Sequence, residues 1–176
     1  MESINKSKPH FHEKGLPELL EKVISNKSFS ASTSLEKALS LSEVVIIAVG
    51  TPSKNGDIDL SYVESVSEQI GKYMKASKNK ITVIVKSTVV PGTTDSFIKN
   101  IIEKNSNLSH KNFGLGMNPE FLKEGSAISD FMNPDRIVFG YEDEKALEIL
   151  KNLYKPWNCK KILVNTRTAE FIKYAN

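Results

Sequence analysis

Short apolar runs alternate along the chain with longer amphipathic segments. Val44–Val49 is a continuous apolar run, mostly β-branched, and the turn Gly50–Pro52 closes it. Ile81–Val85 is a second run of the same kind. Strands that are apolar on both faces are typical of the interior of a parallel sheet. We therefore predict that both runs form central strands of one sheet.

Helices are predicted between these runs, because apolar side chains recur there at helical spacing. Regular alternation of strands and helices predicts an α/β fold with a mostly parallel sheet and right-handed crossovers. The predicted helices are Leu16–Ile24, Ser34–Leu41, Leu60–Met74, Gly92 to about Lys104, Asp143–Leu153 and a last one from about Thr166. The other predicted strands are a short one near Phe29, then Phe113–Met117, Arg136–Gly140 and Ile162–Val164.

The composition is that of an ordinary globular protein. The chain has 176 residues, of which 39% are hydrophobic and 26% charged, and this size favours a single domain. It has no apolar run long enough to span a membrane, and Met1–Pro9 lacks the apolar core of a secretion signal. A net charge of +3, with the lysines spread out, gives no basis for a nucleic-acid partner. We therefore expect a cytoplasmic protein without membrane or nucleic-acid partners.

Neither the cysteine nor the histidines predict any chemistry. Cys159 is the single cysteine, which excludes an internal disulfide and fits a reducing compartment. No histidine lies near it in the sequence, so an inert thiol is the favoured interpretation. His10, His12 and His110 lack the spacing of a zinc site, and we expect no bound metal.

Three loops that follow predicted strands carry the candidate chemistry. They are Gly50–Ser53, Ser87–Gly92 and Asn118–Gly125, and each contains small, hydroxyl or carboxylate side chains. Ligands of open α/β sheets bind outside the carboxyl ends of the strands. We therefore expect a phosphate- or sugar-bearing ligand beside these loops.

Each loop also has a plain structural interpretation. Gly50–Ser53, taken alone, is better explained as a turn that ends a strand. Gly92 opens a predicted helix whose free amides can bind a phosphate or carboxylate ligand, or can simply be capped, with about equal weight. Glu120 and Glu124 share a face if their segment is helical, and can then divide acid–base work. With Lys123 beside them, a solvated charged turn explains these two carboxylates equally.

In order and spacing, these segments together closely resemble the UDP-glucose/GDP-mannose dehydrogenase family. The resemblance covers essentially the whole chain, and it implies a Rossmann-like fold that binds NAD. It also implies an NAD-binding domain over residues 1–165, with residues 166–176 beginning a helix that connects to a further domain. The segments that carry it are Ile4–Lys6, Glu13–Leu16, Val49–Pro52, Gly56–Val63, Lys86–Val89, Asn118–Gly125, Asn133–Val138 and Thr168–Asn176.

The implied reaction is the oxidation of the C6 alcohol of a UDP-sugar to a carboxylate, in two NAD-dependent hydride transfers. Asn133–Val138 looks more like the UDP-glucose branch of the family than the GDP-mannose branch. The resemblance therefore implies a UDP-glucose 6-dehydrogenase of polysaccharide biosynthesis, which as a full-length protein would be a homodimer.

Individual roles follow from the same resemblance. Thr88 matches a threonine that positions the hydrolytic water, Glu120 a general base in thioester hydrolysis, and Lys173 a lysine that stabilises oxyanion charge. The residues that match cofactor contacts are Val49, Gly50, Thr51, Pro52, Ser53, Ser87, Thr88, Val89 and Glu124. Those that match sugar-nucleotide contacts are Glu120, Phe121, Leu122, Lys123, Glu124 and Lys173.

Two features of the family have no counterpart in this sequence. One is the Gly-x-Gly-x-x-Gly turn that holds the NAD pyrophosphate. The other is the nucleophilic cysteine of a C-terminal glycine-rich loop, which Cys159 does not resemble. We therefore expect a fragment truncated at its N-terminus, with the first glycine-rich βαβ unit of about 30 residues or more missing. Alone, it should be inactive and should bind NAD no better than roughly millimolar.

The alternative from another functional class is a non-catalytic nucleotide-binding or interaction module derived from the same family. The reading frame on both sides of the coding sequence distinguishes the two. Continuation into the glycine-rich turn and the cysteine loop would favour the enzyme.

Overall fold

The computed structural model describes all residues except 1, 55, 78–80 and 176. The chain divides into two compact units. The smaller unit comprises Met1–Ala38 and Phe121–Pro134, and the larger unit comprises Leu39–Glu120 and Asp135–Asn176. The larger unit contains the sheet and most of the predicted site residues.

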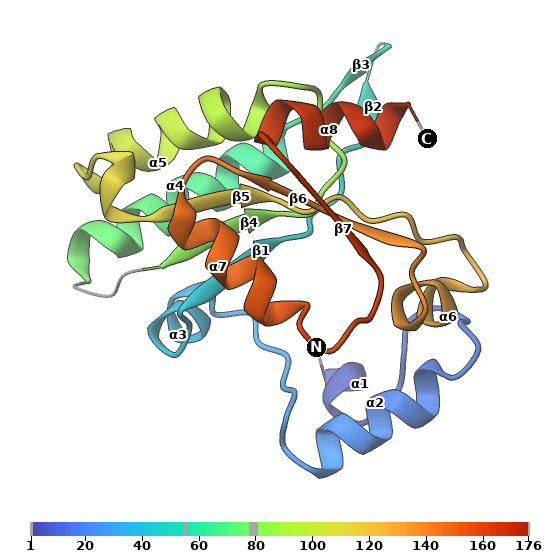
Figure 1. Cartoon of the computed structure of the whole chain (residues 1–176). Coiled ribbons are helices and arrows are strands. Elements are labelled where there is room, and N and C mark those ends of the chain that lie inside the picture. Colours follow the sequence, from blue (N-terminus) through green and yellow to red (C-terminus); the bar gives the residue numbers. More distant parts are fainter. Residues whose placement is uncertain (1, 55, 78–80, 176) are drawn as a thin grey trace. The chain divides into compact units, whose positions relative to one another are not determined.

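A five-stranded sheet forms the centre of the larger unit (Figure 1). Three of its four strand pairings are parallel, and β5 with β6 is antiparallel. The predicted mostly parallel sheet is therefore confirmed. In spatial order the strands are β1 (Val44–Ile47), β4 (Thr82–Val85), β5 (Gly114–Met117), β6 (Arg136–Tyr141) and β7 (Lys160–Val164).

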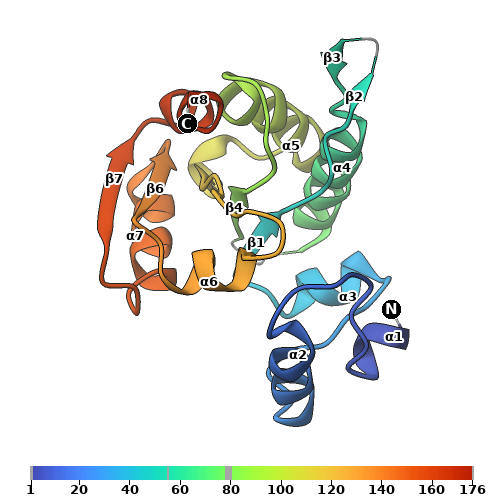
Figure 2. The same cartoon turned by 90° about the vertical axis from the view of Figure 1, so that its right-hand side faces the viewer.

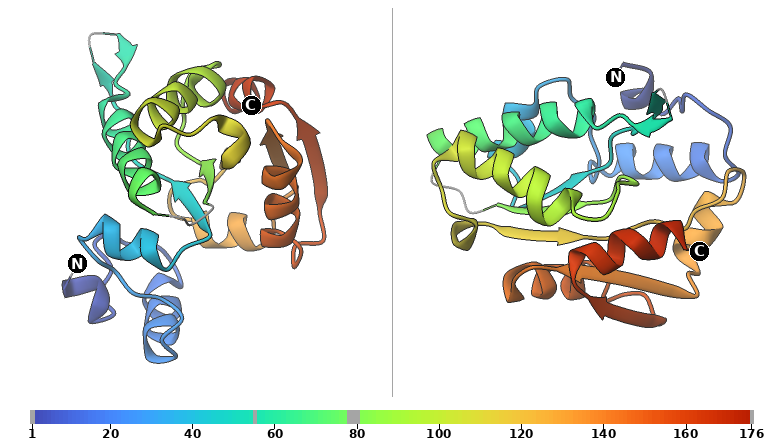
Figure 3. Two further views of the ribbon diagram at one scale, coloured as in Figure 1. Left: turned by 90° about the vertical axis from the view of Figure 1, so that its left-hand side faces the viewer. Right: turned by 90° about the horizontal axis from the view of Figure 1, so that it is seen from above.

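Helices cover both faces of this sheet, with α4, α5 and α8 on one face and α7 on the other (Figure 1). α4 and α5 lie side by side (Figure 3). A π-helical turn, η1, runs directly into α5, so the helix predicted from Gly92 begins with wider turns than an α-helix. The bounds are α3 (Leu35–Ser40), α4 (Ser61–Ala76), η1 (Thr93–Ile98), α5 (Lys99–Ser106), a 3-10 turn η2 (His110–Asn112), α7 (Glu144–Leu153) and α8 (Thr166–Tyr174).

The core lies where the two helical layers meet the central strands. Every residue of β4 and β5 is buried, as continuous apolar or small-residue strands require. α7 buries Ala146, Leu147 and Leu150 against the sheet, which is the face its apolar spacing predicts. Burying one such leucine contributes about 1.5–3 kcal/mol.

The position of β1 differs from the prediction. In the described part of the chain β1 pairs only with β4 and lies at an edge of the sheet, and the Ile46 side chain is 45% exposed. The prediction that Val44–Val49 is a central strand is therefore wrong, whereas that for Ile81–Val85 is confirmed. An apolar run shows that a strand can bury both of its faces, but it does not show whether other strands pair with both of its edges. Figure 2 shows the other edge, where β7 lies beside β6.

The smaller unit contains α1 (Glu2–Asn5), α2 (Leu16–Ser25), α6 (Ala127–Met132) and the first residues of α3, joined by irregular segments. The strand predicted near Phe29 does not form within the described residues. Instead the Asn5 side chain bonds both backbone groups of Ala31, at 2.9 Å each, and so takes the place that a partner strand would hold. The predicted helix Leu16–Ile24 is confirmed as α2.

A short hairpin follows the first strand of the larger unit. It pairs β2 (Ser53–Lys54) with β3 (Asp57–Ile58) in antiparallel register. Ser53, one of the predicted cofactor residues, is therefore an exposed strand residue rather than a turn residue.

Candidate active site at the carboxyl ends of the strands

The loops after β1 and β4 contact each other directly. The Thr51 hydroxyl donates to the carbonyl oxygen of Thr88 at 2.7 Å, and the Ser87 hydroxyl donates to that of Val49 at 2.7 Å. This follows from the parallel pairing of β1 with β4, which brings their carboxyl ends together. The predicted cofactor residues of these two loops thus form one cluster. Within it Gly50 and Pro52 are exposed, whereas Val89 is fully buried.

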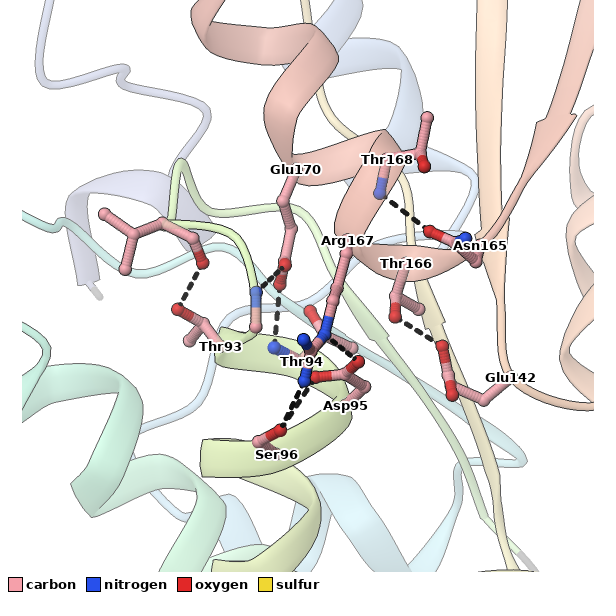
Figure 4. Close-up of polar contacts among 12 residues, drawn as sticks. Thr93, Thr94, Asp95, Ser96, Glu142, Asn165, Thr166, Arg167, Thr168 and Glu170 are labelled. Atoms are coloured by element: carbon pink, nitrogen blue, oxygen red, sulfur yellow. Dashed lines mark hydrogen bonds and ion pairs between the residues drawn. The ribbon is translucent and has the colours of Figure 1, made fainter.

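The helix that opens after the second loop is capped by a carboxylate from a distant part of the chain. The backbone N–H groups of Gly92 and Thr94 donate to the two carboxylate oxygens of Glu170, at 2.6 and 2.7 Å (Figure 4). Gly92 has a φ of 95°, a left-handed conformation that glycine adopts without strain. Of the two interpretations of this helix terminus, capping is therefore the one realised, by a carboxylate of the chain itself.

The environment of Glu170 is closed to solvent. Its side chain is 0% exposed, and burial raises the pKa of the carboxyl group, while the hydrogen bonds from Thr94 and Gly92 lower it. The negative charge of Asp95 raises this pKa further. Asp95 itself forms an ion pair with Arg167 on the surface, and the Arg167 Nη2 donates to Ser96 at 3.2 Å (Figure 4).

Glu120 and Lys173, two of the three predicted catalytic residues, form an ion pair. The Lys173 Nζ lies 2.8 Å from Oε1 of Glu120 and 2.6 Å from its backbone oxygen. Glu120 follows β5 and Lys173 lies in the last turn of α8. Both side chains are only partly exposed, so the pair is held in place but can still be reached from solvent.

A second polar cluster lies at the ends of β4 and β5, and sequence reasoning assigned it no role. The Lys86 Nζ donates to Asn118 Oδ1 at 3.0 Å and to the Tyr154 hydroxyl at 3.4 Å, and that hydroxyl donates to the same Oδ1. The Asn118 amide in turn donates to the Val138 carbonyl at 2.9 Å. Burial lowers the pKa of Lys86 to about 8, although the charge of Glu120 raises it; Lys173 lowers it further. The one signal in the sequence is a lysine directly after four buried strand residues.

The remaining predicted residues lie in the smaller unit. Phe121–Glu124 belong to an irregular segment, so Glu120 and Glu124 do not share a helical face. The chain turns at Gly125, whose N–H donates to the Glu13 carboxylate at 3.0 Å. Glu13 is only 6% exposed, which makes it the anchor of this segment within its unit.

Cys159 is partly buried, and its sulfur lies 3.8 Å from the Lys161 Nζ. Within the described ranges no three or more His, Cys, Asp or Glu side chains gather as a metal site would require. Nor does any helix of the described chain have the length and apolar character needed to cross a bilayer.

Comparisons with known proteins identify related sequences. Residues 1–158 match the UDP-glucose/GDP-mannose dehydrogenase family, NAD binding domain. Over 173 residues the chain is 38% identical to GDP-mannose 6-dehydrogenase of Pseudomonas savastanoi pv. phaseolicola, which covers 97% of the chain and 40% of that protein. Over 165 residues it is 38% identical to UDP-glucose 6-dehydrogenase TuaD of Bacillus subtilis, covering 93% of the chain and 35% of TuaD.

Solved structures give the same result. The chain superposes on GDP-mannose dehydrogenase from Pseudomonas aeruginosa, solved as a ternary complex, with a TM-score of 0.96 and 38% identity. The TM-score is 0.93, also at 38% identity, for UDP-glucose dehydrogenase from Pyrobaculum islandicum. In both cases the match covers 99% of this chain and 40% of the other, so the chain spans about two fifths of its relatives. These matches confirm the resemblance, the α/β class and NAD as the cofactor.

Proposed function

The chain belongs to the UDP-glucose/GDP-mannose dehydrogenase family, and from this premise we propose that it is part of a UDP-glucose 6-dehydrogenase. In this proposal residues 1–165 form part of the NAD site, and residues 166–176 begin the helix that leads to a further domain. The complete protein would be a cytoplasmic homodimer of polysaccharide biosynthesis that converts UDP-glucose to UDP-glucuronate. Gel filtration of that complete protein would test the dimer.

The Glu120–Lys173 pair is the observation that carries this proposal. Oxidation of an alcohol passes through an alkoxide-like state, and a fixed ammonium group stabilises such a charge without reorganising. Hydrolysis of a covalent intermediate needs a base beside the water, and an ionised carboxylate can serve. Lys173 and Glu120 place these two groups 2.8 Å apart, at the carboxyl end of β5 where ligands of such sheets bind.

The cofactor would lie against the cluster formed by the loops after β1 and β4. Gly50, Pro52 and Ser53 are exposed there, and glycine permits a close approach of a ligand. Thr88 is partly exposed and lies in the same cluster through its bond from Thr51, which supports its proposed role of positioning water. The segment Phe121–Glu124 would contact the sugar nucleotide.

The choice of UDP-glucose rests on the segment Asn133–Val138. Relatives named for GDP-mannose and for UDP-glucose are equally similar, at 38% identity each, so they do not decide between the substrates. Both sugar nucleotides should therefore be assayed side by side.

A chimera tests the activity. The chain would be joined to the flanking N- and C-terminal segments of TuaD, which restore the parts outside the region of similarity, and NADH formation would be followed by its absorbance. We expect turnover of UDP-glucose and little with GDP-mannose. A folded chimera that oxidises only GDP-mannose would contradict the substrate proposal. One that binds NAD but oxidises neither would favour the non-catalytic module.

Two variants of the chimera test the roles of the ion pair. Lys173→Ala should lower kcat about 10²–10³-fold, the usual loss for one oxyanion donor. Glu120→Gln should let the covalent intermediate accumulate, which mass spectrometry of the intact protein would detect. Lys151→Ala on the exposed side of α7 is the matched control and should leave both measurements unchanged. If the chimera stays fully active with both ion-pair substitutions, the assignment of these roles is wrong.

A further inference from the structure

Glu170 is a buried charge that the proposed reaction does not use. Among the described residues the buried charged side chains are Glu13 and Glu170, and Glu170 is fully enclosed. Its carboxylate binds the N–H groups of Gly92 and Thr94, 78 and 76 residues away in the sequence. It therefore joins the N-terminus of η1 to α8, two elements that pack on the same part of the sheet.

Burying this carboxylate has a cost, and the structure offsets it locally. An ion removed from water loses much of its favourable hydration, and relaxation of the protein restores only part of it. Two charge-assisted hydrogen bonds and the positive end of the helix compensate for part of that loss. A nearby alternative exists in Asp95, in the first turn of η1, but this side chain pairs with Arg167 on the surface. The helix terminus is thus capped across the fold rather than from its own first turn.

Both ends of this link are next to proposed site residues. Gly92 ends the loop that begins with Ser87 and Thr88. On α8, Lys173 follows Glu170 by three residues, so the two side chains lie on the same side of the helix within one turn. α8 packs closely on β6 because Gly140 has no side chain, and a Cβ added there would lie only 2.6 Å from the Cβ of Ala169. The helix therefore has little freedom to slide along the strand. Fixing Glu170 therefore fixes where Lys173 meets Glu120.

We propose that Glu170 is a positioning residue, whose carboxylate couples the loop that carries Thr88 to the helix that carries Lys173. Through this link the hydroxyl and the ammonium group keep one relative placement at the carboxyl ends of β4 and β5. The importance of that placement rests on the proposed function, whereas the coupling itself is a property of the chain. The Arg167–Asp95 pair joins the same two elements on the surface, where an exposed ion pair contributes little.

NMR on the full chain tests the coupling without any activity. Glu170→Gln keeps the shape but leaves one acceptor oxygen for two N–H groups. Amide hydrogens of Gly92 and Thr94 should then exchange about tenfold faster or more, the effect of one lost charge-assisted bond. The Thr88 amide and the Lys173 side-chain signals should move as well. Asp95→Asn, which removes the surface pair, should leave the Lys173 signal in place.

The decisive outcome concerns the distant signals. One outcome is that Glu170→Gln speeds amide exchange at Gly92 and Thr94 but leaves the NMR signals of Thr88 and Lys173 in place. In that case Glu170 is only a local cap and the proposal fails. Should that variant not fold, Gly92→Ala strains the other end of the link, and it should move the Lys173 signal too. Gly56→Ala is its matched control, because Gly56 has a similar φ of 90° and open space around it. Equal Lys173 signals in these two glycine variants would also overturn the proposal.

The chimera adds a readout that depends on function. There, Glu170→Gln should lower kcat about tenfold or more, with KM for both substrates within about twofold, because the reacting groups are misplaced rather than the ligands lost. An unchanged kcat in an active chimera would count against positioning. An inactive parent chimera would contradict the proposed function alone, since the NMR result still decides the coupling.

Discussion

Lys86 and Glu170 are two charges of opposite sign in the same unit, the first partly buried and the second fully buried, and the hydrogen bonds of both go to neutral groups. Lys86 binds the side chains of Asn118 and Tyr154 and, at 3.4 Å, the backbone oxygen of Asn118, whereas Glu170 binds only backbone N–H groups at the start of a helix. Burial favours the neutral form of each group. It lowers the pKa of Lys86 to about 8 and raises the pKa of the Glu170 carboxyl group. Desolvation therefore disfavours the charged form at both sites, but the groups that bind the charge by hydrogen bonds differ.

This difference determines what each site loses when its charge is removed. Without Glu170, the N–H groups of Gly92 and Thr94 have no carboxylate to bind, and a buried backbone donor left unpaired is costly. Without Lys86, the Tyr154 hydroxyl still donates to Asn118 Oδ1, while the Asn118 carbonyl and the Tyr154 oxygen each lose a donor that lies 3.4 Å away. The Glu170 charge, bound by backbone donors at under 3 Å, is thus part of the fold, whereas the Lys86 charge, bound mainly by side chains, can be replaced.

The largest expected effect is the loss of stability in Glu170→Ala. The substitution leaves two buried N–H groups unpaired and opens a cavity, and we expect a loss of about 3 kcal/mol in the free energy of unfolding. Urea unfolding at pH 7 followed by circular dichroism measures it. Lys86→Met, which replaces the other charge with a similar volume, should cost less than about 1 kcal/mol under the same conditions. Similar losses in both variants would contradict the distinction.

The second prediction concerns the pH dependence of stability. The folded pKa of Lys86, about 8, lies below its unfolded value of 10.5. Below pH 8 both states hold the proton and the cost of burying the cation is fully present. Between pH 8 and 10.5 the unfolded state binds more protons, so the free energy of unfolding rises with pH, by about 3 kcal/mol in total.

Comparison with Lys86→Met isolates this rise from other titrations. The stability difference between the native chain and the variant should shift in favour of the native chain from pH 8 to pH 10. Urea unfolding at four pH values across that window measures the shift. Lys151→Met, at an exposed position of α7, is the control and should follow the native curve. If the free energy of unfolding of Lys86→Met changes with pH in the same way as that of the native chain, the Lys86 ammonium group is not desolvated.

The third prediction separates the two donors of Asn118. Tyr154→Phe removes the hydroxyl and keeps the ring, which packs against Phe139 and Trp157. Because Lys86 still donates to Asn118, we expect a loss of about 1 kcal/mol, the typical value of one neutral hydrogen bond. The double variant Lys86→Met with Tyr154→Phe should lose clearly more than the sum of the single changes, since Asn118 Oδ1 then has neither donor. Additive losses would show that the two donors act independently.

The outline of the fold could be predicted because it depends on local patterns. Val83 and Leu115 are buried, as their apolar runs require. α7 begins at Glu144, one residue after the predicted Asp143, which caps the helix by accepting a hydrogen bond from the Ala146 N–H. The misplacement of Val44–Val49 at the centre of the sheet has a physical reason, since pairing at a strand edge leaves no mark on the pattern of side chains. The strand near Phe29 failed for a related reason, because a side chain, Asn5, satisfies the backbone there.

The site was predictable only where short segments carry its residues. Thr88, Glu120 and Lys173 stand in recognisable loops or in the last helix, and the structure pairs the latter two. The partners of Lys86 lie 32 and 68 residues away and those of Glu170 lie 76 and 78 residues away, and no spacing along the sequence encodes such contacts. Within Thr168–Asn176, Glu170 has the appearance of an ordinary exposed helix residue, and only the three-dimensional packing distinguishes it.

The smallest expected effect belongs to the surface ion pair of Arg167 and Asp95, which joins the same elements as Glu170. Asp95→Asn removes the charge while keeping the size. The Asp95 side chain is 16% exposed, but that of Arg167 is 61% exposed, so water solvates the guanidinium group that loses its partner. An ion pair with an exposed partner contributes little to stability, and we expect a change much smaller than that of Glu170→Ala. Removing the Asp95 charge also removes a repulsion that raises the pKa of Glu170, which offsets part of the loss.

Urea unfolding at low and high salt measures both contributions, because salt screens the exposed pair more than the buried carboxylate. A loss as large as that of Glu170→Ala would show that the surface pair, rather than the buried carboxylate, holds α8 to η1.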